Sequence, residues 1–84
     1  MRPNPEIAKS RENQAEKFLA EYLDLTELVV ENGLANCPLS GYFRALEKGL
    51  EEFRAGYETT NAKQISELIQ NVRAAIDEQL KEAA

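Results

Sequence analysis

The sequence contains no histidine and no tryptophan, and Cys37 is its single cysteine. One cysteine cannot close an internal disulfide, and without histidine the usual ligand sets for zinc and iron are incomplete. A catalytic nucleophile would also lack the base that activates it, and no glycine-rich phosphate loop is present. We therefore expect a chain that is not an enzyme and holds no metal or cofactor, with Cys37 as a structural or incidental thiol.

Long hydrophobic runs are missing as well. The opening residues, Met-Arg-Pro-Asn-Pro, lead into mixed charge and not into the apolar segment of a signal peptide. The longest apolar stretch is far shorter than a membrane span. We expect a cytoplasmic protein with no membrane partner. Its 84 residues predict one domain over 1–84, with a core so small that a partner or dimerisation would add usefully to its stability.

Basic residues are scarce in the first half of the chain. The net charge is −5, and no lysine or arginine lies between Lys17 and Arg44. Residues 6–32 carry seven acidic and three basic side chains, whereas residues 39–57 are neutral overall. Contact with phosphates needs clustered lysine and arginine, so we expect no direct binding of nucleic acid.

What the sequence does have is three stretches of apolar residues at helical spacing. The middle stretch is the sharpest, because its members are spaced 4, 3, 4, 3 and 4 residues apart, which is the heptad seam of one helix face. These members are Leu39, Phe43, Leu46, Leu50, Phe53 and Tyr57. A third stretch repeats every three or four residues from Ile65 to Leu80. Tyrosines in these stretches are expected at the edges of the core.

Turn and capping residues divide these stretches. Asn4 before Pro5 predicts a helix start, and Gly33 predicts a left-handed helix end on which Leu34 packs back. Asn36 or Cys37 is expected to cap the second helix, and Asn61 with Gln64 resembles a capping box for the third. We predict an all-α fold, an antiparallel three-helix bundle with a long first helix, the helices spanning about 5–32, 38–57 and 61–82. Dimerisation is one way to complete it.

The predicted first helix is apolar over more of its surface than a bundle requires. Between residues 18 and 30 its apolar side chains spread over roughly 220°, whereas about 100° suffices for a core-facing stripe. Asp24, Glu27 and Glu31 fall within about 60° of one face. We expect this surplus to bind another protein, although a wide core contact beside a solvated acidic face is the simpler interpretation. The predicted protein-binding residues are Leu19, Tyr22, Leu23, Asp24, Glu27, Leu28, Val30 and Glu31.

Two further features leave alternatives open. The first half of the first helix is poor in apolar residues, so it either projects from the bundle or frays. Gly49 and Gly56 each cost about 1 kcal/mol relative to alanine inside a helix, which calls for a reason. A neighbouring backbone that approaches closely is one reason, a partner groove is another, and helix termination is a third for Gly56.

These features favour a small non-catalytic interaction module, an adaptor, small subunit or inhibitor. Its partner would be another protein chain, and we expect a homodimer or a complex built on the first helix. The alternative is an acidic inhibitor of the phage anti-defence type, which imitates nucleic acid and blocks a nucleic-acid-binding enzyme.

Overall fold

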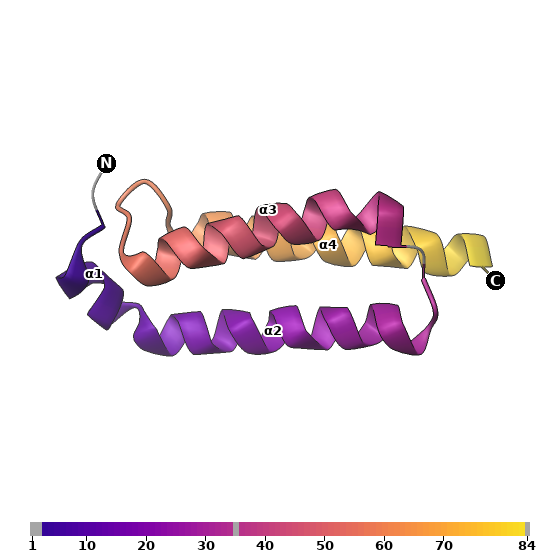
Figure 1. Ribbon diagram of the computed structural model, residues 1–84, viewed down its shortest axis with the longest axis horizontal. Coiled ribbons are helices and arrows are strands. Elements are labelled where there is room, and N and C mark those ends of the chain that lie inside the picture. The colour runs from indigo at the N-terminus through magenta and orange to yellow at the C-terminus, as the bar shows by residue number, and fades with distance from the viewer. Residues whose placement is uncertain (1–2, 35, 84) are drawn as a thin grey trace.

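The computed structural model describes residues 3–34 and 36–83, and within those ranges every regular element is an α-helix. The elements are α1 (Pro5–Ser10), α2 (Glu12–Glu31), α3 (Asn36–Ala55) and α4 (Ala62–Ala83). Figure 1 shows that α3 runs antiparallel to α2 and that α4 returns beside α3. The molecule measures 46 × 21 × 16 Å along its principal axes. The α3–α4 contact is the most extensive in the fold. No helix in the described part of the chain is both long and apolar enough to cross a membrane.

The core forms from the predicted apolar stripes, because each long helix turns one stripe toward the other two. Phe53 packs edge-on against the ring of Phe18, with their centroids 5.6 Å apart. Half-buried residues such as Leu34 and Leu80 pack against this core at the end of the molecule where α2 meets α3 and α4 ends. The buried apolar residues are Ala15, Leu25, Val29, Leu39, Leu46, Leu50, Phe53, Ile65, Ile69, Val72 and Ile76.

Three predicted helix ends are confirmed. The Asn4 carboxamide oxygen accepts hydrogen bonds from the N–H groups of Glu6 and Ile7. Gly33 has φ +59°, and the Leu34 N–H donates to the Val29 carbonyl at 3.0 Å, as in a Schellman motif. The predicted capping box is reciprocal: the Asn61 N–H donates to the Gln64 side chain and the Gln64 N–H donates to the Asn61 side chain, at 2.8 and 2.9 Å.

Helix α3, which corresponds to the second predicted helix, begins earlier than predicted. It starts at Asn36, two residues before the predicted boundary, and α4 begins at Ala62, one residue after its predicted boundary. The capping role expected for Asn36 or Cys37, and the role of the Cys37 thiol, concern side chains that lie outside the described residues.

The single helix predicted over 5–32 consists in the structure of two helices that meet at Arg11. The Arg11 backbone has φ −91° and ψ −6°, and the chain turns there. Its Nη1 donates hydrogen bonds to the carbonyls of Phe53 and Tyr57, at 3.2 and 2.9 Å, and its guanidinium lies 4.5 Å above the Phe53 ring. Carbonyls at a helix end have no partner within the helix, so a cation there is favourable. Arg11 thus ties the turn to the end of α3.

Helix α1 packs against the end of α3 and does not project away from the other helices. Its contact explains Gly56, which follows α3 with φ +90°. A β-carbon at Gly56 would overlap the Asn4 carbonyl oxygen and stand 2.8 Å from the Ala8 nitrogen. Both helix termination and close backbone approach are therefore confirmed for Gly56. At Gly49 the neighbours are side chains instead, with Leu68 Cδ1 2.7 Å from the position of a β-carbon.

Candidate protein-interaction face

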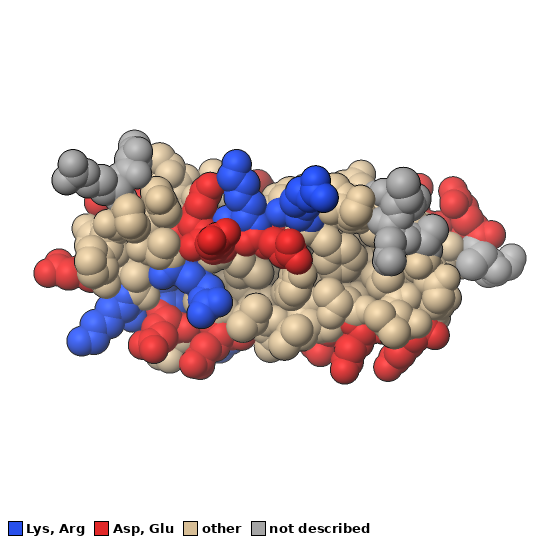
Figure 2. Space-filling view, in the orientation of Figure 1, with Lys and Arg blue, Asp and Glu red and all other residues tan. Residues whose placement is uncertain are grey.

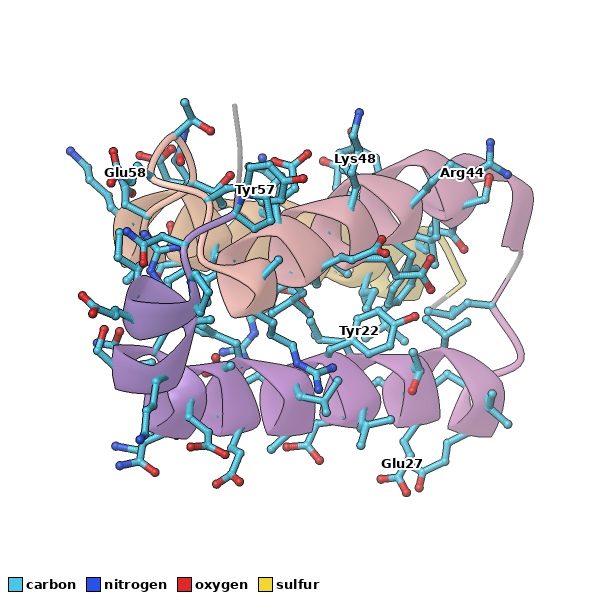
Figure 3. All side chains as sticks on the ribbon, turned by 60° about the vertical axis from the view of Figure 1, so that its left-hand side comes forward. Tyr22, Glu27, Arg44, Lys48, Tyr57 and Glu58 are labelled. Atoms are coloured by element: carbon cyan, nitrogen blue, oxygen red, sulfur yellow. The ribbon has the colours of Figure 1, made fainter. Side chains whose placement is uncertain are left out.

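Tyr22 is the predicted site residue that the structure turns inward. Its hydroxyl donates a hydrogen bond to the Glu47 carboxylate, and its ring packs edge-on against Phe43 with centroids 5.9 Å apart. In Figure 3 its side chain points from α2 toward α3. Burial raises the pKa of the Tyr22 hydroxyl to about 12, with the hydrogen bond to Glu47 and the charge of that carboxylate adding to the shift. Tyr22 therefore supports the α2–α3 contact.

The other apolar site residues remain accessible on α2. Leu23 is 55 % exposed and Val30 is 79 % exposed, and both share a flank with the half-buried Leu19. With Thr26 they form a series spaced 4, 3 and 4 residues apart, within about 60° of one another around the helix. We call Leu19, Leu23, Thr26 and Val30 the apolar seam. Heptad spacing of this kind is typical of a helix that packs along another helix.

The acidic site residues Asp24, Glu27 and Glu31, here called the acidic row, are all exposed. The row begins about 40° beyond Leu23, and Leu28, which is 38 % exposed, lies on its other side. Glu27 points away from α3 and α4 in Figure 3. Figure 2 shows acidic side chains along the α2 edge of the molecule, with basic side chains near its α1 end, and a mixture of acidic and basic side chains toward the opposite edge. Among the described residues no three acidic or thiol side chains are grouped to hold a metal ion.

Two depressions lie along the first half of α2 and meet the apolar seam at Leu19. One depression of about 360 Å³ lies between Leu19, Tyr22 and Leu50. A second, of about 500 Å³, continues past Ala15 toward α1. The two depressions share Leu19 and Arg54, so they adjoin, and we call them together the α2–α3 groove. The side chains that line this groove can hold an elongated apolar ligand. They include no nucleophile grouped with a base.

The sequence did not predict the depression on the opposite side of α3. Tyr42, expected at the edge of the core, is 47 % exposed beside a depression of about 260 Å³ against α4. Gly41 and Ala45 leave this space open, and a β-carbon at Gly41 would meet nothing within 4 Å. The small residues one turn apart are the signal that could have indicated this depression.

Comparison with models of protein families gives no match to this chain, and comparisons with curated proteins and with solved structures give none either.

Proposed function

We propose that this chain is a small non-catalytic interaction module, an adaptor, subunit or inhibitor, that presents α2 to another protein chain. The binding face comprises the apolar seam, the acidic row and Leu28. In this proposal α2, α3 and α4 act as an antiparallel bundle with α1 across one end, and a partner or second copy completes it. The proposed setting is the cytoplasm.

The observation that carries the proposal is the exposure of Leu23 and Val30. They lie one heptad apart on the same flank of α2, so they present a line of apolar surface rather than isolated side chains. A line of this kind next to a groove resembles half of a helix–helix contact, and burying it against a partner removes apolar area from water.

The exposed acidic row favours the second candidate, an acidic inhibitor that imitates nucleic acid. The target of such an inhibitor is a basic groove, so binding should weaken steeply as salt rises. An apolar contact should resist salt. The two candidates therefore differ in the salt dependence of partner capture.

Affinity capture from cells that encode the chain tests the proposal with a matched pair of variants. Leu23→Ser with Val30→Ser removes the exposed centre of the seam without adding charge. Tyr42→Ser, at a similarly exposed apolar side chain on α3, is the control. We expect the control to capture the same partner as the wild type and the seam variant to capture at least about tenfold less. Equal capture by both variants, or no capture by the wild type, contradicts the proposal.

A further inference from the structure

We infer that the occupant of the apolar seam and the α2–α3 groove is one amphipathic helix of a different chain, with lysine or arginine beside its apolar stripe. This inference rests on the proposed function and specifies its partner. It follows from the shape of the site and from the charges along it.

The shape of the site fits a helix. From Glu12, which lines the groove, to Val30, at the end of the seam, the surface is about 27 Å long, the length of about 18 helical residues. Leu19 belongs to both the groove and the seam, so the two surfaces adjoin. The Thr26 hydroxyl donates to the Leu23 carbonyl at 2.7 Å, so a partner can cover it without leaving that donor unsatisfied.

Glutamates flank this surface on both sides. On the outer side Glu16 and Glu27 lie within about 40° of Leu23 around α2. Across the groove α3 contributes Glu47 and Glu51, and the cations that line the groove are Arg54 and, from α1, Lys9. A helix seated here meets carboxylates along both edges of its apolar stripe. Lysine or arginine at those edges is complementary.

The same charges disfavour a second copy. A two-fold symmetric dimer brings the same patch from each chain, so a patch in which glutamates outnumber Lys9 and Arg54 would meet a second patch of the same net charge. Like charges across an interface oppose association. A lysine- or arginine-flanked helix has no such conflict.

Two designed peptides test the inference. Both have about three heptads, with leucine at the positions that would face the apolar seam. One peptide has lysine at every position that flanks these leucines, and the other has glutamate there. Repulsion between like flanks keeps each peptide from pairing with itself. Fluorescence anisotropy with the full chain should give a Kd at least about tenfold lower for the lysine peptide. Equal binding, stronger binding of the glutamate peptide, or no binding of either peptide would overturn the inference.

Two charge variants show whether the glutamates beside the seam cause the preference for the lysine peptide. Glu16→Gln with Glu27→Gln removes two charges beside the seam, whereas Glu67→Gln with Glu78→Gln removes two exposed charges from α4. The lysine peptide should lose at least about threefold more affinity for the first variant than for the second. Equal losses would mean that only net charge acts, which contradicts a local site.

Sedimentation equilibrium separates this inference from the proposed function. We expect the wild-type chain alone to be monomeric. A dimer that Leu23→Ser with Val30→Ser dissociates would overturn the basic helix as occupant while leaving an interaction function on α2. Binding of the lysine peptide without seam-dependent capture from cells would instead support the site chemistry and contradict the proposed function.

Discussion

The backbone N–H of Asn4 donates a 3.2 Å hydrogen bond to the carbonyl of Gly56, which joins the start of α1 to the end of α3. The contact leaves no room for a side chain at Gly56. A β-carbon there would overlap the Asn4 carbonyl oxygen, and the backbone is already at φ +90°, where side chains are strained. The first helical segment is therefore held by backbone contact as well as by Arg11.

Gly56→Ala should destabilise the fold strongly. Gly33→Ala is the matched control, because Gly33 also has positive φ but has nothing within 4 Å of a β-carbon. The control should lower the free energy of unfolding by about 1 to 2 kcal/mol through backbone strain alone. Gly56→Ala should lower the free energy of unfolding by about 1 to 3 kcal/mol more than the control does, because its β-carbon overlaps Asn4. Chemical denaturation measures both, and equal losses would contradict the close contact.

Gly49 should respond to the size of its replacement. Alanine would press on Leu68 Cδ1 at 2.7 Å and Ile65 Cδ1 at 3.2 Å, both ends of flexible side chains, while gaining about 1 kcal/mol of helix propensity. We expect Gly49→Ala to be nearly neutral and Gly49→Leu to destabilise by more than about 1 kcal/mol. Gly41→Ala, with open space around it, should stabilise by up to about 1 kcal/mol. A Gly49→Leu variant at least as stable as the wild type would refute close packing there.

The Tyr22–Glu47 contact predicts a loss of stability at high pH. The pKa of Tyr22 is raised to about 12 in the folded chain, against about 10 when unfolded. The protonated hydroxyl thus contributes stability that is fully present below pH 10 and is lost as the pH rises toward 12. Tyr22→Phe should remove this part of the pH dependence, as measured by denaturation of both proteins across that range. Parallel curves for the two proteins would show that Tyr22 is not responsible.

The acidic row distinguishes the two candidate functions. Changing Asp24→Asn, Glu27→Gln and Glu31→Gln together preserves shape and removes three exposed charges. The melting temperature should change little, because exposed charges contribute weakly to folding. Partner affinity should fall modestly, mainly through a slower association rate, because apolar contacts hold the complex. A loss of about three orders of magnitude, matched by an equally steep salt dependence in the wild type, would favour the nucleic-acid mimic instead.

Local sequence signals predicted much of this fold. The capping box at Asn61, the helix end at Gly33 and the buried stripes of α3 and α4 depend on residues within a few positions of one another. The break at Arg11 does not. It depends on carbonyls 42 and 46 residues away along the chain, which no local spacing indicates. An arginine within a helical stretch looks like an ordinary helix former until those partners are placed.

The candidate face was likewise predicted only in part from the sequence. Helical periodicity placed Leu23 and Val30 together on one flank, and the structure leaves both exposed. The inward position of Tyr22 depends on how α2 is aligned along α3, which brings Glu47 to its hydroxyl. The same alignment sets the groove beside Leu19, so its shape could not be derived from one helix alone.

Site-specific photo-cross-linking in living cells tests the central claim, that the seam of α2 is where another chain binds. A benzophenone side chain would replace Val30, the most exposed residue of the seam, and in a second variant it would replace the exposed Tyr42 on α3. We expect a discrete cross-linked product from position 30 and little or none from position 42. The Leu23→Ser substitution should reduce the product from position 30. No product at position 30, or equal products at both positions, would contradict the account.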